Sequence, residues 1–351
     1  MAYTAVIVAM GATTPLGRDA WASAAAVRAG ISGFSQHPYM IDTAGEPMRA
    51  AIAPWLDIEL GGAERLEALL FPAIDETLAP LATLRGPPPR LAITLGLPSP
   101  RPGVAEDLPQ DMVARVNRRY ARRIGSAAPF AAGHAAGLLG LQSACAKLAQ
   151  GSLDACVVAG VDSWIDPDAL EWLEANDQLH GAGPLNNAWG FIPGEGAAAL
   201  LLMRAPVAQA AGLPTLAVVL GTGSANEPKR IKTETVCIGE GLTQAFRTAL
   251  AALPAGAVVS DVYCDMNGEP YRADEFGFTA LRTKESFASA SDFVAPADCW
   301  GDVAAAGAIL HLVLACAAGQ KGYANGPLAL AWASGEMGER AAALLATGMG
   351  S

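Results

Sequence analysis

One histidine stands at the predicted start of a helix, where its ring could take part in proton transfer. Residues 131–162 read as a tight turn, a helix and a buried strand, with His134 in the turn. Because the positive end of a helix dipole disfavours an imidazolium, we expect a neutral ring there. A neutral imidazole can accept or donate a proton, but it holds an acyl group poorly. Two interpretations stay open, a general acid or base and a ring that fills a buried pocket, and we favour the second.

The elements that position His134 are defined by glycines and apolar spacing. Gly133 and Gly137 flank the turn and permit close backbone approach. Apolar residues then recur at helical spacing, at Leu138, Leu141, Cys145 and Leu148. Gly151 stands where a helix would end, and the apolar run 156–159 is typical of a strand covered on both faces.

The same patterns predict the other elements. We expect strands at 4–10, 91–96, 216–220, 258–264 and, as the last one, 328–333. Within 191–203, Gly194 and Gly196 are expected to make a turn before a further apolar strand. We expect helices at 18–29, 64–81, 112–123, 164–173, 242–253, 274–285 and 301–319, with a break at 85–90 and loops at 98–109, 174–189 and 221–235. One arrangement of a helix followed by a strand occurs twice. The first helix lies between Gly133 and Gly151, and the second lies between Gly301 and Gly319, which have the same separation. This repeat suggests a duplicated α/β fold.

Composition narrows the classes of function. The 351 residues are 52% apolar and 16% charged, which indicates a large core. A net charge of −11 argues against a nucleic-acid-binding protein. The six cysteines form no CxxC pair and histidines number only four, so we expect no metal site. The cysteines look like core residues of a reducing compartment, which predicts a cytoplasmic protein. We expect neither a signal peptide nor a membrane span.

Six segments of the chain resemble the β-ketoacyl synthases of the thiolase superfamily. They are AMGATTPLG (9–17), GHAAGLLGL (133–141), PLNNAWGFIPGEGAAALLL (184–202), DVYCDMNGEP (261–270), WGDVAAAGAIL (300–310) and ASGEMG (333–338). The resemblance implies a duplicated, five-layered αβαβα fold, with thiolase-like halves at 1–215 and 216–351. It implies no cofactor, and it implies a homodimer or a heterodimer with an active synthase.

The same resemblance assigns three catalytic positions, and none holds the expected residue. The cysteine that takes the acyl group falls on His134. The first histidine falls on Asn267, and the second on Asp302, or on Gly301 if the count runs back from AAAG. Asn267 can donate to an oxyanion or form the turn before Gly268, and Asp302 can cap a helix. A carboxylate would also repel the enolate of a condensation. The candidate pocket residues are Gly133, Gly268, Cys299, Gly301, Gly335 and Gly338.

A predicted helix carries an unusual group of arginines. They are Arg115, Arg118, Arg119, Arg122 and Arg123. On an acidic protein such a helix can dock an acidic partner, including an acyl carrier protein, or it can simply be a solvated face.

Three functions remain open from the sequence. The first, which we favour, is a non-condensing homologue that binds an acyl chain, a thioester or a protein, as a chain-length-factor-like partner or an adaptor does. The second is an acyltransferase or thioester hydrolase that uses His134. The third is a 3-oxoacyl-acyl-carrier-protein synthase with a displaced nucleophile. If the chain is an enzyme, we expect an acyltransferase of the β-ketoacyl synthase type.

Overall fold

The computed structural model describes residues 5–84, 88–230 and 233–348. Its main element is a mixed sheet of nine strands. In spatial order these are β5 (Ser126–Ala131), β4 (Leu91–Leu97), β6 (Ala155–Ser163), β7 (Glu195–Arg204), β1 (Ala5–Thr13), β8 (Ala217–Asn226), β11 (Glu339–Thr347), β10 (Leu328–Ser334) and β9 (Asp261–Cys264). A separate hairpin joins β2 (Phe34–Ile41) to β3 (Pro47–Ala51).

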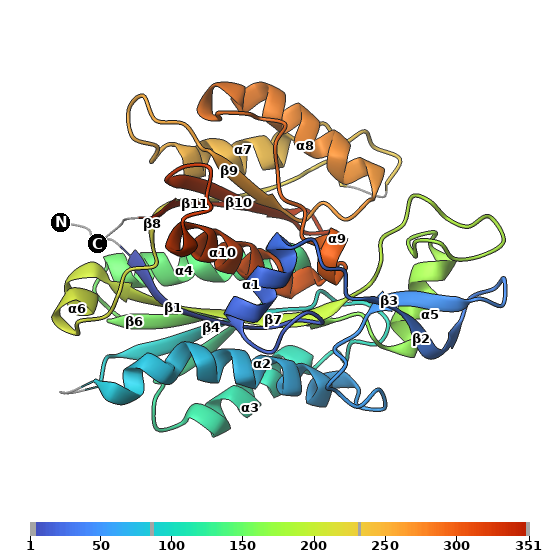
Figure 1. The fold of residues 1–351 in the computed structure, drawn as a ribbon, viewed down its shortest axis with the longest axis horizontal. Coiled ribbons are helices and arrows are strands. Elements are labelled where there is room, and N and C mark those ends of the chain that lie inside the picture. Colours follow the sequence, from blue (N-terminus) through green and yellow to red (C-terminus); the bar gives the residue numbers. More distant parts are fainter. Residues whose placement is uncertain (1–4, 85–87, 231–232, 349–351) are drawn as a thin grey trace.

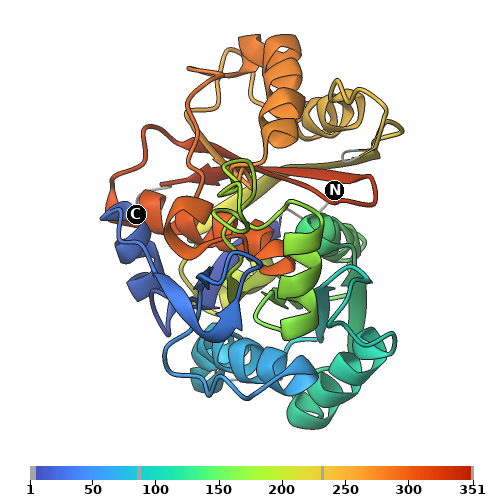
Figure 2. The same ribbon diagram turned by 90° about the vertical axis from the view of Figure 1, so that its right-hand side faces the viewer.

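The sheet divides into two layers between β1 and β8. These strands pair over three residues only, 5–7 with 217–219, and the two parts of the sheet then separate around a layer of helices (Figure 1). The middle layer holds α1 (Ala20–Arg28), α4 (Ala136–Ala149) and α10 (Ala304–Lys321). The outer layers hold α2 (Gly62–Leu78) with α3 (Leu108–Tyr120), and α7 (Glu240–Leu250) with α8 (Pro270–Thr283) (Figures 1 and 2). The expected five-layered αβαβα arrangement is confirmed.

Shorter helices complete the chain. They are α5 (Pro167–Ala175), α6 (Ala205–Ala210) and α9 (Ala297–Trp300), with single 3-10 turns at η1 (Ala79–Thr83), η2 (Gly133–Ala135) and η3 (Lys284–Ser286).

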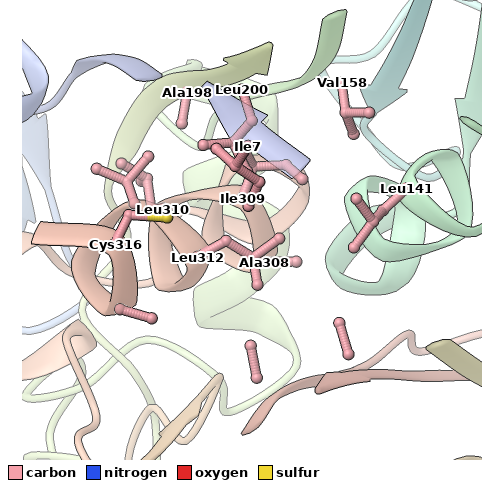
Figure 3. Close-up of a cluster of buried hydrophobic side chains, with 14 of the residues drawn as sticks. Ile7, Leu141, Val158, Ala198, Leu200, Ala308, Ile309, Leu310, Leu312 and Cys316 are labelled. Carbon is pink, nitrogen blue, oxygen red and sulfur yellow. The ribbon is translucent and has the colours of Figure 1, made fainter. Parts of the chain in front are cut away.

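The largest core cluster surrounds α10. Ile309 and Leu310 pack among side chains of β1 and β7, including Ile7 and Leu200, and α4 contributes Leu141 on the other side (Figure 3). Among the described residues, α10 is the one helix long and apolar enough to cross a membrane, but 83% of that window is buried inside the protein. Its apolarity is therefore that of a core helix.

The structure corrects several element boundaries. β8 continues to Asn226, inside the segment expected to be a loop from 221. The strand β11 follows β10, so 328–333 is not the last strand. The strands β2, β3 and β5 were not expected at all. The helix α10 ends at Lys321 with Gly322 in the left-handed region, beyond the expected end at Gly319. Part of the expected break at 85–90, residues 85–87, lies outside the described residues.

The predicted boundary between residues 215 and 216 falls between the two groups of strands. β1 and β4–β7 precede it, whereas β8–β11 follow it. The helix α10 comes from the second half of the sequence, yet it packs on β6 and β7 of the first. The division into two halves stays a prediction.

Candidate functional site

The turn that carries His134 has the predicted form. The strand β5 ends at Ala131, the 3-10 turn η2 follows, and α4 begins at Ala136. Gly133 adopts a φ of +53°, which favours glycine, and a Cβ on it would lie 3.2 Å from the Ser99 hydroxyl. His134 is held at the start of this helical segment with only 4% of its surface exposed.

His134 and Asn267, which lie far from Asp302 in the sequence, both contact the Asp302 carboxylate. The Nε2 atom of His134 lies 2.9 Å from both carboxylate oxygens of Asp302. The side-chain amide of Asn267 donates to Asp302 Oδ2 at 2.6 Å. The Ala304 amide, at the start of α10, donates to Oδ1 at 2.8 Å. Asp302 therefore holds the first residue of α10 and also joins the other two positions that the resemblance assigned.

Asn267 also makes the turn that was its other interpretation. Its Oδ1 accepts from the Glu269 backbone amide at 3.1 Å, and its amide donates to Glu269 Oε2 at 3.1 Å. Glu269 is buried and accepts a further hydrogen bond from the Tyr271 hydroxyl at 2.7 Å. Both donors of the Asn267 amide are thus directed at carboxylates of the protein.

A buried arginine that the sequence analysis missed completes the cluster. Arg272, on α8, has no exposed surface, and its Nη2 lies 3.2 Å from His134 Nε2. Its Nη1 donates to Asp265 Oδ2 at 2.8 Å and to the Ser334 carbonyl at 3.2 Å. One feature of the sequence indicated that Arg272 could reach the site. Arg272 follows Asn267 closely and shares the inward face of α8 with Glu275 and Phe276.

The charges of this cluster are set by burial and by neighbours. Burial alone would raise the pKa of Asp302, but His134, Arg272 and the Asn267 amide together hold that pKa well below its ordinary value of 3.8. Because Asp302 is a carboxylate and accepts from Nε2 through both oxygens, we place a proton on that nitrogen. The nitrogen is then occupied and cannot take a proton from a substrate.

A second buried histidine faces the same cavity from α10. His311 is 2% exposed, and its Nδ1 has no hydrogen-bond partner among the described residues. Burial, and then the proximity of His134, lowers the pKa of His311 to about 3. The His311 ring is therefore neutral at pH 7.

The cavity at this site is small. It has a volume of about 20 Å³, and its lining includes His134, His311, Asn267, Asp302, Trp300 and Gly301. Such a volume holds about one water molecule. Of the expected pocket residues only Gly301 lines it. Gly133 faces Ser99, Gly268 lies close to Gly190, Gly335 lies against Glu339, Gly338 faces Asn226, and Cys299 is buried outside the lining.

No cysteine stands at the start of α4. All six cysteines are free thiols, and Cys264 alone among them lines the cavity. Its Sγ lies 3.5 Å from the Val294 carbonyl, and burial raises its pKa far above the ordinary value. Burial also raises the pKa of Cys299. Both thiols are therefore poor nucleophiles at neutral pH.

One group of side chains has the spacing of metal ligands, but it is already satisfied. Atoms of Glu227, Cys237 and Glu275 lie within 4.8 Å of one another. The guanidinium of Arg340 pairs with Glu275, and the Glu227 carboxylate accepts from the Gly241 amide at 2.7 Å. The arginine supplies the positive charge that a cation would otherwise bring.

The arginine-rich helix is α3, and its cations are not equivalent. Arg115 pairs with Glu67 at 2.7 Å and with Asp111 at 2.9 Å. Arg119 pairs with Asp75 at 2.5 Å. The other three are exposed, and two of them lie beyond the end of α3: Arg118, Arg122 and Arg123.

Comparisons with known proteins agree with this fold. Residues 102–208 match the sequence profile "Beta-ketoacyl synthase, N-terminal domain". No curated protein sequence is significantly similar to the chain. A chain of a type II polyketide synthase acyl-carrier protein complex with its ketosynthase bound to the hexaketide superposes with a TM-score of 0.79 at 16% identity, over 99% of this chain and 100% of that one.

Two further solved structures give similar values. A ketosynthase from module 6 of the bacillaene synthase of Bacillus subtilis 168 has a TM-score of 0.77 at 16% identity, over 98% of this chain and 72% of that one. The ishigamide ketosynthase/chain length factor has a TM-score of 0.71 at 22% identity, over 98% and 99%. The chain therefore has the thiolase-like fold of these ketosynthase structures. Within it, residues 102–208 correspond to the β-ketoacyl synthase N-terminal domain.

Proposed function

We propose that this ketosynthase-like protein does not condense acyl groups and acts by binding, as a partner of an active ketosynthase in the manner of a chain length factor. The observation that carries the proposal is the engagement of His134 at the start of the α4 segment. Its Nε2 contacts Asp302 at 2.9 Å and lies 3.2 Å from Arg272. A histidine at this place holds an acyl group poorly, and its Nε2 is not free to accept a proton from a substrate.

The electrostatics of the site support the same function. Decarboxylative condensation develops negative charge on an enolate, which needs donors or cations around it. Here the carboxylates of Asp302, Asp265 and Glu269 lie in or beside the cluster, and Asn267 donates to two of them. An enolate at this place would meet negative charge in a buried, weakly screening environment.

The volume of the cavity also supports a function without acyl condensation. About 20 Å³ accommodates a water molecule but not an acyl chain attached to a carrier arm. An acyl group that reaches this chain would therefore have to bind elsewhere or to a partner.

The open edge of the sheet supplies a surface for that partner. The strand β5 is the terminal strand on one side, and Ser126, Pro129 and Ala131 are exposed along it. Edge strands present unpaired backbone groups that a second chain can extend. Since one matched structure is described as a ketosynthase/chain length factor, we propose a heterodimer or homodimer through β5. On this proposal the protein serves polyketide or fatty acid synthesis in the cytoplasm.

Labelled acyl thioesters test the proposal directly. The protein is incubated with radiolabelled acyl-coenzyme A and with malonyl-coenzyme A, and covalent label, thioester hydrolysis and carbon dioxide release are measured. We expect none of the three, with an ordinary cysteine-dependent ketosynthase as the positive control. Label on a cysteine would instead establish a displaced nucleophile.

One observation keeps a hydrolase as the second candidate. The buried His134–Asp302 pair has the form of a base held by a carboxylate. Thioester turnover without covalent label, lost in His134→Gln, would favour this candidate over the binding function.

A further inference from the structure

A groove lies between two helices on the opposite end of α10 from His134. It is formed by α1 and the last turns of α10, and it has a volume of about 620 Å³. Its lining includes Trp21, Ala24, Arg28, Ala317, Lys321 and Tyr323. Figure 1 shows α1 lying against α10 in the middle layer. The alanines leave room for a third backbone to approach closely.

Two cations are held over two aromatic rings at this groove. The Nζ atom of Lys321 lies 4.6 Å from the ring centroid of Trp21, and the guanidinium carbon of Arg28 lies 4.1 Å from that of Tyr323. Each cation also lies in the last turn of its helix, where it offsets the negative end of the helix dipole. The ring contacts direct both cations toward the groove.

The groove differs in charge from the rest of the protein. Its lining residues include these two cations and no carboxylate. Within the described residues, no carboxylate forms a salt bridge with Arg28 or Lys321. The chain as a whole carries 34 acidic and 23 basic residues. A local positive rim on an acidic protein selects for an acidic partner over a basic one.

From this geometry we propose that the α1–α10 groove binds an acidic amphipathic helix of a partner protein. Apolar side chains at helical spacing would contact the alanines and Trp21, a residue that is 40% exposed. Acidic side chains flanking that stripe would pair with Arg28 and Lys321. The inference rests on the proposed function in one respect, since it names a partner for a protein that acts by binding.

Fluorescence anisotropy of the whole protein tests the groove. The probe is a fluorescein-labelled synthetic peptide with leucines at helical spacing and glutamates elsewhere. One control peptide has the same composition in scrambled order. The other control peptide has lysine in place of glutamate. We expect the acidic helical peptide to bind and both controls to bind more weakly, with an affinity that falls as salt is added.

Charge reversal locates the binding site. We expect Arg28→Glu/Lys321→Glu to raise the dissociation constant at least about tenfold, about 1.4 kcal/mol. The matched control is Arg247→Glu on α7 with Lys284→Glu just beyond α8, which reverses the same number of charges on another exposed surface and should leave the affinity unchanged. Should the groove variant unfold, Arg28→Gln/Lys321→Gln, checked by thermal unfolding, gives the same comparison with a smaller effect.

Three results would overturn the inference. They are equal affinity for the wild type and the groove variants, equal binding of the scrambled peptide, and a loss of binding in the control variant instead. Displacement of the peptide by coenzyme A, with no effect of groove substitutions, would also count against it. The acylation assay is run on the same variants, so a failed groove and a failed non-condensing function give different results.

Discussion

At the scale of single residues, the centre of this protein is a buried network of charges. Asp302 accepts from His134, Asn267 and the Ala304 amide, and Arg272 adds a cation beside the ring. Burying charged groups costs free energy. Here each charged group has a hydrogen-bond or ion-pair partner that offsets this cost. The contact with Asp302 that satisfies His134 Nε2 also keeps this nitrogen from accepting a proton from a substrate.

The Asp302 carboxylate should be the most sensitive member of this network. We expect Asp302→Ala to destabilise the fold by about 3–5 kcal/mol, because it leaves the His134 N–H and the Asn267 amide without their acceptor and removes a negative charge near the buried Arg272. Urea unfolding measures the change. Asp302→Asn, which keeps the shape, should cost less. If both variants unfold at the same urea concentration as the wild type, the network does not stabilise the fold.

His311 should make the protein sensitive to mild acid. The pKa of His311 is lowered from 6.5 to about 3 in the folded protein. Between these two pH values His311 is therefore protonated in the unfolded chain and neutral in the folded one. The contribution of the neutral His311 to the free energy of unfolding is present above pH 6.5. It is lost as the pH falls toward 3, by up to about 1.4 kcal/mol per pH unit.

The matched variant is His311→Leu, which removes the titrating ring and its unpartnered Nδ1. Unfolding free energies at pH 7 and pH 5 should differ less in this variant than in the wild type. An unchanged difference would show that His311 is not the group responsible.

At the scale of elements, close contacts between backbones position α10 and hence Asp302. A Cβ on Gly160 of β6 would lie 2.4 Å from the Ala305 carbonyl oxygen, and one on Gly194 would lie 2.3 Å from the Trp300 carbonyl oxygen. The first turn of α10 and the segment before it therefore lie directly on β6 and on the chain entering β7. These glycines are required by space rather than by φ.

Two glycine substitutions should therefore act in opposite directions. We expect Gly160→Ala to lower stability by about 1–3 kcal/mol, because α10 must move away from the sheet. Gly277 is exposed in α8 with nothing within 4 Å of its Cβ position, so Gly277→Ala should raise stability by about 0.5–1 kcal/mol. Thermal unfolding of the two variants checks both signs. A tolerated Gly160→Ala would mean that the α10–β6 contact is not tight.

At the scale of the whole molecule, the two edges of the sheet differ. Backbone hydrogen bonds of Val294 with Cys264 and Val262 of β9 cover part of one edge, whereas β5 ends the other with half of its residues exposed. Pro129 removes one donor from that edge but leaves the flanking residues able to pair. The edge is also near the site, since His134 follows β5 by three residues.

A charge placed on this edge should separate the proposed dimer. We expect Ala131→Lys to shift the molar mass measured by light scattering from dimer toward monomer, because lysines at a sheet edge oppose pairing with another chain. The matched control is Ala121→Lys, also exposed but outside β5. A dimer that persists in Ala131→Lys would exclude β5 as its interface.

The sequence by itself determined the local unit around His134. The turn, the helix and the strand of residues 131–162 lie as predicted, because glycine sterics and apolar periodicity act between near neighbours. It also led to His134, Asn267 and Asp302 through motif resemblance. It did not show β5 or β11, since one contains a proline and the other, ERAAALLAT, has residues of high helix propensity.

Only the tertiary structure decided the state of the site. Arg272 and His134 are 138 positions apart, and Asp302 and His134 are 168 apart, so no local pattern reports their contact. The small cavity and the unpartnered Nδ1 of His311 likewise arise where the His134 turn, the segment after β9 and α10 pack together. Burial and long-range pairing fix the charge of a side chain, and with it what that side chain can do.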